Sequence, residues 1–236
     1  MNYVIIGGSH GITRGVLERL VAGGHHVHAF SRSASDLDQF GDSVEHTTFD
    51  VMQDELPVDG LPDQVHGFVY GPGSINLRSF RSLDIDAFRD DLELNVMGAI
   101  RTLKPLLKPL KKSAEPGRPS SIVFFSTVAV GQGLALHTSV ATAKGALESL
   151  ARSLAADLAP NTRVNCVAPA LTDTPLAKRF FETDEKAEAM AERYPLARCG
   201  TVDDIADAAC FLLSPQAGWV TGQTVGVDGG MSTIRK

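Results

Sequence analysis

The sequence predicts a single α/β domain in which a doubly wound parallel sheet carries helices on both faces. Short runs of β-branched and aromatic residues alternate with segments of helical apolar spacing from the first residues onward. Regular strand–helix alternation is typical of parallel sheets whose crossover helices cover both faces. The 236 residues suffice for one sizeable core, and we find no repeat or interdomain linker. We therefore expect residues 1–236 to form one domain.

Seven strands and three prominent helices are expected in order along the chain. The strands are residues 3–6, 27–30, 47–49, 67–70, 122–125, 163–167 and 224–227. One helix runs through residues 16–22, a long one passes through residues 88–104 and ends before Pro105, and one after His137 carries Lys144 on its largely apolar face. In such a sheet the ligand lies outside the carboxyl ends of the strands.

Composition and charge exclude several classes of function. The net charge of -6 and the pI near 5.6 argue against a nucleic-acid or anionic-membrane surface. The three cysteines lack metal-ligand or C-x-x-C spacing and suit a reducing compartment. No apolar run approaches membrane-spanning length, and the chain begins directly with a strand, which leaves no room for a signal peptide. We expect a cytoplasmic protein that binds no metal, nucleic acid or membrane and acts on a small-molecule substrate.

A glycine-rich turn joins the first strand to the first helix. Glycines there permit a tight turn, and the helix N-terminus offers free N–H groups to a pyrophosphate. Its position between the first strand and the first helix favours nucleotide binding over a plain connection. The residues expected at the nucleotide are Gly7, Ser9, His10, Gly11 and Ile12.

The residues after the second strand predict which cofactor is bound. A carboxylate at position 31 would bond the adenosine ribose and repel a 2′-phosphate, whereas Ser31 does neither. Arg32 offers a bidentate guanidinium for a phosphate, and Ser33 follows it. These three residues therefore favour a cofactor that carries a 2′-phosphate.

The ordered motifs resemble the short-chain dehydrogenase/reductase family over nearly the whole chain. The family's turn, T-G-x-x-x-G-x-G, aligns with residues 6–13, where Ile6 replaces the threonine and Thr13 the last glycine. We expect Thr13 to hold the first helix and strand slightly further apart. The resemblance implies a Rossmann domain that binds NADP(H), with His10 in a loop position that is often basic in NADP-dependent members. It is nearest to 3-oxoacyl-thioester reductases and to sugar or steroid dehydrogenases.

The resemblance also assigns cofactor-binding residues further along the chain. Asp50 and Val51 match the adenine pocket, and Thr174 matches the threonine whose hydroxyl holds the nicotinamide carboxamide. Tyr70 and Pro72 are departures from the family's N-N-A-G stretch. The remaining residues assigned to the cofactor are Gly71, Pro72, Gly73, Lys144, Pro169 and Thr172. Residues 202–206, 211–214 and 220–230 complete the match. By the same resemblance, the last third of the chain implies a homo-oligomer, either a dimer or a tetramer. A monomer by light scattering would contradict this expectation.

The catalytic motif departs from the family at one position. Family members use a Y-x-x-x-K pair, in which the tyrosine exchanges the proton and the lysine lowers its pKa and binds the nicotinamide ribose. Counting back four residues from Lys144 gives Val140, and valine cannot transfer a proton. Asn95 matches the proton-relay asparagine, and Thr127 keeps a hydroxyl where the family has its serine. The acid alone is missing.

The missing tyrosine leaves three alternatives open. The first is an oxidoreductase with a substitute acid: His137 lies seven residues before Lys144, the Y-x6-K spacing of the enoyl-reductase branch, and Tyr70 is a weaker candidate. The second is an NADPH-binding protein with impaired catalysis that acts as a sensor or partner subunit, and the third is a purely structural subunit of a hetero-oligomer. We favour an active reductase, with residues 172–200 as a lid over the substrate.

Overall fold

Seven parallel strands form one sheet in the computed structural model, which describes residues 1–57 and 59–235. The order is β3-β2-β1-β4-β5-β6-β7, so the direction of winding reverses between β1 and β4. This reversal is the topological switch point at which ligands bind to open α/β sheets. The strands are β1 (Asn2–Ile6), β2 (His26–Ser31), β3 (Val44–Thr48), β4 (Gly67–Tyr70), β5 (Ser120–Phe125), β6 (Thr162–Pro169) and β7 (Thr224–Val227).

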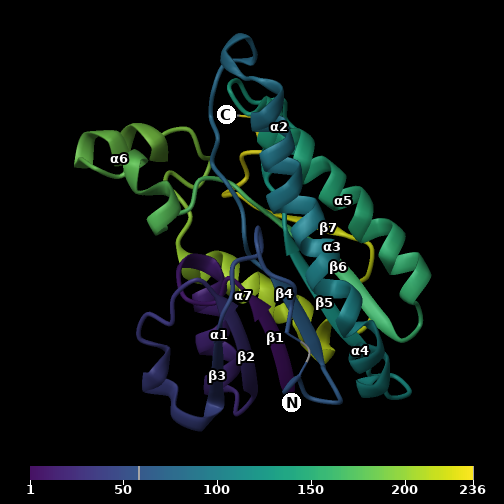
Figure 1. Ribbon diagram of the computed structural model, residues 1–236. Helices are drawn as coiled ribbons and strands as arrows, with labels where there is room; N and C mark the ends of the chain where they lie inside the picture. Colours follow the sequence, from purple (N-terminus) through teal and green to yellow (C-terminus); the bar gives the residue numbers. More distant parts are fainter. Residues whose placement is uncertain (58, 236) are drawn as a thin grey trace.

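Helices cover both faces of the sheet, as the alternating pattern predicts (Figure 1). One face carries α1 (Gly11–Ala22) and α7 (Val202–Leu213). The other carries α2 (Ile85–Leu92), α3 (Gly98–Leu103), α4 (Leu107–Ser113) and α5 (Thr138–Leu158). The expected fold class, a doubly wound parallel sheet, is confirmed.

Successive strand residues point into two separate cores. Ile5 and Val69 pack with α1 and α7, whereas their neighbours Ile6 and Phe68 pack with the α2 to α5 layer. Strands buried on both faces are read as continuous apolar runs, which is why β4 and β5 were recognisable from composition alone.

The α-helical part of the long helix in the second layer ends at Leu103, before Pro105, as expected. A π-helical segment (Glu93–Met97) joins α2 to α3, and a 3-10 turn (Lys104–Leu106) continues into α4. Pro105 occupies the first turn of this continuation, where its missing N–H costs no helical hydrogen bond. The third strand, in contrast, begins earlier than the expected residues 47–49. It starts at Val44, which pairs with Val27 of β2.

Thr13 is accommodated in the turn by a glycine on another strand. Its hydroxyl donates to the carbonyl oxygen of Gly7 at 2.5 Å. A Cβ atom on Gly71 would lie 2.2 Å from the Thr13 methyl carbon. Thr13 therefore fills the space that Gly71, at the end of β4, leaves open.

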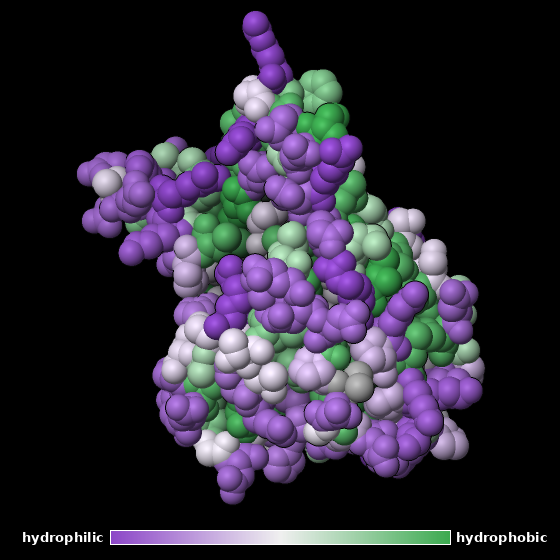
Figure 2. All heavy atoms as spheres, viewed as in Figure 1, coloured by the Kyte–Doolittle hydropathy of each residue, from purple (hydrophilic) through white to green (hydrophobic). Residues whose placement is uncertain are grey.

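Residues 172–200, which we call the lid segment, contain a 3-10 helix (Pro175–Phe180) and α6 (Asp184–Ala191). α6 projects from the body of the protein in Figure 1, and none of its residues is buried. Its surface is mostly hydrophilic, and hydrophobic residues show in the recess beside it (Figure 2). Across residues 1–57 and 59–235 no helix has the length and apolarity needed to cross a bilayer.

Candidate active site

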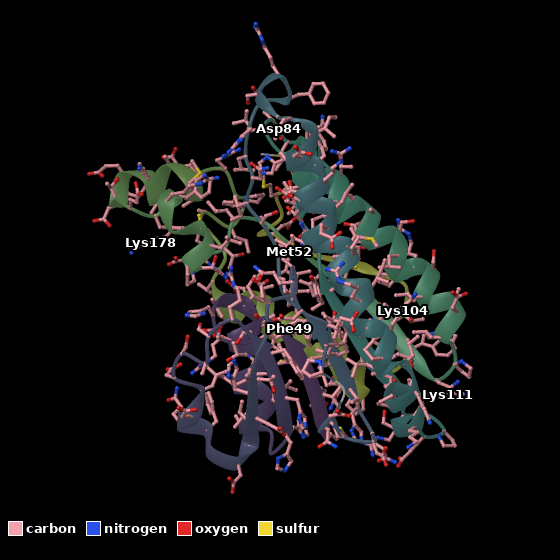
Figure 3. The ribbon with its side chains drawn as sticks, viewed as in Figure 1. Phe49, Met52, Asp84, Lys104, Lys111 and Lys178 are labelled. Atoms are coloured by element: carbon pink, nitrogen blue, oxygen red, sulfur yellow. The ribbon has the colours of Figure 1, made fainter. Side chains whose placement is uncertain are left out.

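A cavity of about 680 Å³ opens at the carboxyl ends of the strands. It extends from the glycine-rich turn to the lid segment, and Phe49 and Met52, which also line it, lie near the centre of the view in Figure 3. Every residue predicted to bind the cofactor contributes to its wall. These residues are Gly7, Ser9, His10, Gly11, Ile12, Ser31, Arg32, Ser33, Asp50, Val51, Gly71, Pro72, Gly73, Lys144, Pro169, Thr172 and Thr174.

The glycine-rich turn presents an open helix N-terminus to this cavity. Gly7 and Gly11 have φ values of 85° and 62°, a left-handed backbone that glycine adopts without strain. His10 at the N-cap of α1 makes no side-chain capping bond, and the first turn carries no acidic residue. The first N–H groups of α1 are thus left for an external anion. A pyrophosphate fits this turn.

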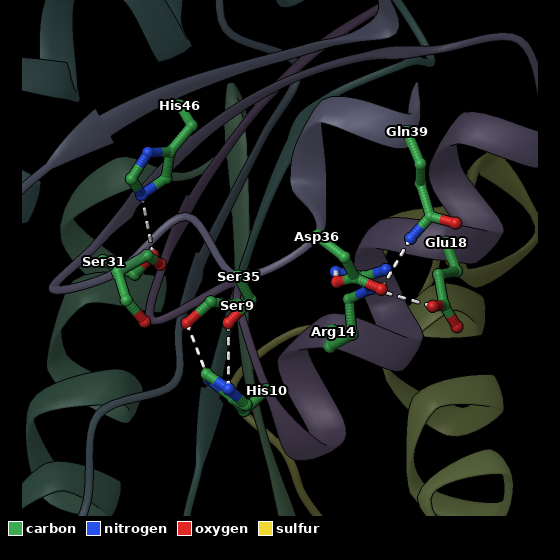
Figure 4. Close-up of polar contacts among 10 residues, drawn as sticks. Ser9, His10, Arg14, Glu18, Ser31, Ser35, Asp36, Gln39 and His46 are labelled. Carbon is green, nitrogen blue, oxygen red and sulfur yellow. Dashed lines mark hydrogen bonds and ion pairs between the residues drawn. The ribbon is translucent and has the colours of Figure 1, made fainter. Parts of the chain in front are cut away.

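Serine and histidine side chains lie in hydrogen-bonded groups near the end of β2 (Figure 4). The Ser31 hydroxyl donates to the carbonyl oxygen of Ser33 at 2.9 Å and lies 3.0 Å from His46 Nε2. Both ring nitrogens of His10 are engaged, by Ser9 and Ser35 hydroxyls at 2.9 Å each. No carboxylate lines the cavity at this point.

Arg32 is the cation available beside these hydroxyl groups. It is exposed, lines the cavity and makes no hydrogen bond or ion pair with any residue that the structure describes. Arg14, by contrast, is bound to Glu18 at 2.8 Å and to Asp36 at 2.7 Å. An unpaired guanidinium next to hydroxyl donors is suited to a phosphate monoester.

Lys144 is almost completely buried at the centre of the site. Its side chain is 6% exposed, and Nζ donates to the carbonyl oxygen of Phe125, the last residue of β5, at 2.7 Å. Burial lowers the pKa of this lysine to about 8, although nearby Cys166 and Asp91 act in the opposite direction. A Cβ atom on Gly73 would lie 3.3 Å from Nζ, so a side chain at this position would crowd the amine.

Asn95 lies behind this wall, within the π-helical segment. It is fully buried and is not a lining residue of the cavity. Its Nδ2 donates to the Asp91 carbonyl oxygen at 2.8 Å, and its Oδ1 has no partner among the described residues. Oδ1 lies 3.5 Å from the Cβ position of Gly73, close to Lys144 Nζ. A π-helical segment often marks a functional site, and here it supports a buried amide oxygen without a partner.

Three residues at the start of α5 and the end of β5 complete the cavity wall. Thr127 Oγ1 accepts a hydrogen bond from Ala129 N at 3.3 Å. Val140 lies one helical turn before Lys144, is 5% exposed and faces the cavity. His137 at the N-cap of α5 also lines the cavity, with Nδ1 2.7 Å from the Ala135 carbonyl oxygen. This part of the wall thus combines one apolar side chain with two polar ones.

Comparison with known proteins establishes the family. Residues 8–232 match the family described as enoyl-(acyl carrier protein) reductase. L-xylulose reductase of Bos taurus is 31% identical over 233 residues, which cover 96% of this chain and 94% of that protein. The chain belongs to the short-chain dehydrogenase/reductase family.

Solved structures of the short-chain dehydrogenase/reductase family share this architecture. A short chain dehydrogenase family protein from Francisella tularensis subsp. tularensis SCHU S4 superposes with a TM-score of 0.87 at 27% identity, covering 99% of each chain. The 3-ketoacyl-(acyl-carrier-protein) reductase from Brucella melitensis, solved with NADH, has a TM-score of 0.85 at 25% identity over 98% of each chain. The protein is thus an oxidoreductase by family.

Tyr70 does not face the cavity of this short-chain dehydrogenase/reductase. Its side chain is 1% exposed, and its hydroxyl donates to the Leu94 carbonyl oxygen. Burial raises the pKa of this phenol. A Cβ atom on Gly98 would lie 2.3 Å from the hydroxyl, so the ring is packed against α3. The weaker alternative, Tyr70 as the acid, was wrong.

Two buried carboxylates beside the site were missed by the sequence analysis. The Ser126 hydroxyl donates to Glu148 Oε1 at 2.5 Å, and Glu148 lies one helical turn after Lys144. The Ser74 hydroxyl donates to Asp91 Oδ1 at 2.5 Å. Helical spacing from Lys144 and from Asn95 could have identified Glu148 and Asp91. Their serine hydrogen-bond partners could be identified only from the three-dimensional structure.

Proposed function

We propose that the protein is an NADP(H)-dependent oxidoreductase that transfers a hydride to or from a carbonyl or hydroxyl substrate. The observation that carries the proposal is one cavity wall that joins the open N-terminus of α1, the unpaired Arg32 and the buried Lys144. A dinucleotide with a 2′-phosphate has an anionic centre, an anionic end and a ribose that match these three features.

The chain's own residues would bind and orient the cofactor, whose nicotinamide supplies the hydride when it is bound. In this proposal α1 receives the pyrophosphate, Arg32 the 2′-phosphate, and Asp50 and Val51 the adenine. Thr174 lies near Gly11 and would hold the nicotinamide carboxamide. Lys144 would donate hydrogen bonds to the nicotinamide ribose.

Three residues would handle the substrate oxygen and its proton. The Thr127 hydroxyl would polarise the carbonyl group, and the Lys144 ammonium would stabilise the negative charge that develops on its oxygen. His137 lines the same cavity and would supply the proton in place of the tyrosine. Asn95 would hold a water molecule with its unpaired Oδ1 and connect Lys144 to solvent.

The lid segment would cover the substrate. The lining on this side is largely apolar, and its members include Leu134, Leu176, Phe180, Met190 and Met231. Such a wall favours substrates with an apolar body, of which 3-oxoacyl thioesters are our first candidate. Reduction of an enoyl C=C bond by the same hydride is the alternative, supported by the spacing of His137 and Lys144 and by the description of the matched family.

The function is tested by NADPH oxidation against ketones, sugars, 3-oxoacyl thioesters and enoyl thioesters. We expect turnover on at least one class, and the class that is turned over distinguishes C=O from C=C reduction. His137→Phe should reduce kcat by about 10²-fold or more without loss of NADPH binding, because a general acid contributes about 10²- to 10⁴-fold. His25→Phe is the matched control outside the cavity. Unchanged turnover in His137→Phe would exclude His137 as the proton donor.

Cofactor choice is tested at Ser31. Ser31→Asp places a carboxylate beside the 2′-phosphate site, so we expect NADPH affinity to fall by about tenfold or more, equivalent to about 1.4 kcal/mol. NADH should be bound as well as or better than by the wild type. Titration calorimetry with both cofactors measures the two changes, and Ser43→Asp is a control at a half-buried serine outside the cavity, the last residue of the 3-10 helix before β3. Equal losses for NADPH and NADH would contradict the assignment of the 2′-phosphate to this position.

A binding-only protein is the second candidate, and Val140 favours it. An apolar residue one turn before Lys144 removes the family's acid while the cavity wall for the cofactor is retained. Tight NADPH binding without turnover on any substrate class would support a sensor or partner-subunit role. Absence of NADPH binding would exclude both candidates.

A further inference from the structure

Asp91 on α2 is a buried carboxylate that the motifs of the family do not assign. Its side chain is 3% exposed. Oδ1 accepts the Ser74 hydroxyl at 2.5 Å, and Oδ2 has no partner among the residues that the structure describes. A buried carboxylate with only one hydrogen bond is costly unless a positive charge lies nearby. A cation nearby would therefore stabilise the charged form of Asp91.

The surrounding contacts connect Asp91 to Lys144. Asn95 Nδ2 donates to the Asp91 carbonyl oxygen at 2.8 Å and reaches the Ser74 hydroxyl at 3.4 Å. Gly73 directly precedes Ser74, and its Cβ position lies 3.3 Å from Lys144 Nζ and 3.5 Å from Asn95 Oδ1. Lys144 and Asn95 thus flank Gly73, and Ser74 and Asn95 connect it to Asp91, which gives a group of four polar side chains. We call them the Gly73 cluster.

The other titratable groups near Lys144 do not supply the opposing negative charge. Cys166 on β6 is buried, which raises the pKa of its thiol to about 12, so the thiol is neutral at physiological pH. Glu148 lies on α5 itself, but it is bound by Ser126 and lies 3.8 Å from Arg152. His137 lies two turns earlier at the helix start. Asp91 is the carboxylate left to act on Lys144 across the cluster.

We propose that Asp91, held by Ser74, is a positioning residue that keeps Lys144 protonated in a site that has no tyrosine. Burial disfavours the ammonium form of Lys144, and a carboxylate within the same cluster partly offsets that effect. Lys144 can then keep both its hydrogen bond to the Phe125 carbonyl oxygen and its positive charge toward the cavity. The kinetic part of this inference rests on the proposed function, whereas the charge of Lys144 belongs to the protein alone.

The test compares Asp91→Asn with Asp90→Asn, the same change at the exposed neighbour on α2. Lysine side-chain NMR of the protein without cofactor measures the titration of Lys144, whose resonance is assigned by its absence in Lys144→Met. We expect Asp91→Asn to reduce the ratio of protonated to neutral Lys144 by roughly tenfold or more at a given pH, since an opposite charge nearby shifts a pKa by about 1–3. Asp90→Asn should leave this ratio unchanged.

Two further measurements separate the possible outcomes. Ser74→Ala releases the Asp91 carboxylate without removing it, so we expect a smaller shift in the same direction; this variant serves if Asp91→Asn fails to fold. In Asp91→Asn the fall of kcat/KM with rising pH should move to lower pH by the same amount as the Lys144 titration. An unchanged Lys144 titration in both variants overturns the inference. A shifted titration in a protein without turnover leaves it standing and contradicts the proposed function.

Discussion

Lys144→Met should lower kcat/KM for NADPH-dependent reduction by about 10³-fold or more, since loss of a preorganised charge at a developing oxyanion alone costs about 10²- to 10³-fold. Methionine keeps the volume of the buried stem but loses the hydrogen bond to the Phe125 carbonyl oxygen and the positive charge. NADPH affinity should fall as well, because Lys144 also faces the proposed ribose site. The measurement is steady-state kinetics together with cofactor titration and thermal unfolding.

The matched control is Lys104→Met, since Lys104 is an exposed residue of the same type on the second helical layer. It should leave all three measurements unchanged. The wild-type enzyme should also lose reductase activity as pH rises through about 8, because the pKa of Lys144 is lowered to about 8 and its ammonium form is present below that value. Turnover that persists in Lys144→Met would contradict the role of this residue.

Val140→Tyr should raise turnover by about tenfold or more. A positioned general acid contributes about 10²- to 10⁴-fold to the rate, and His137 would already supply part of that contribution in the wild type. The new phenol would enter the cavity one helical turn before Lys144, in the Y-x-x-x-K spacing of the family. The adjacent ammonium would lower the pKa of the phenol and so favour proton exchange. The experiment compares kcat on the best substrate of the panel.

Val140→Phe is the control for this substitution, because it adds the ring without the hydroxyl group. We expect it to be no faster than the wild type and to narrow the cavity. A gain in both variants would attribute the effect to packing. No gain in Val140→Tyr, with cofactor binding retained, would show that proton supply does not limit the wild-type enzyme.

The sequence predicted the sheet and the position of Lys144 because both depend on local patterns. Apolar runs identify strands buried on two faces, and helical spacing places Lys144 on the inner side of α5. The Gly73 cluster could not be predicted in the same way. Ser74 meets Asp91 only because the chain after β4 passes beside α2, and no periodicity in either segment encodes that contact.

Thr13 illustrates the same limit at the cofactor turn. Taken alone, a threonine in place of the family's glycine predicts a wider separation of helix and strand. The structure places its methyl group over Gly71, a residue distant in sequence whose missing side chain provides the room. The continuation past Pro105 into α4 is a further case, because the effect of a proline on a helix depends on which turn it occupies.

Because α6 is exposed, it can move away from the site without disturbing the packing that stabilises the sheet. No side chain of α6 contributes to either core, so lifting it away would expose little apolar surface. Its amide hydrogens should exchange with solvent long before those of β4 or β5. Substitutions that strengthen the core would therefore raise the melting temperature without slowing substrate entry or product release.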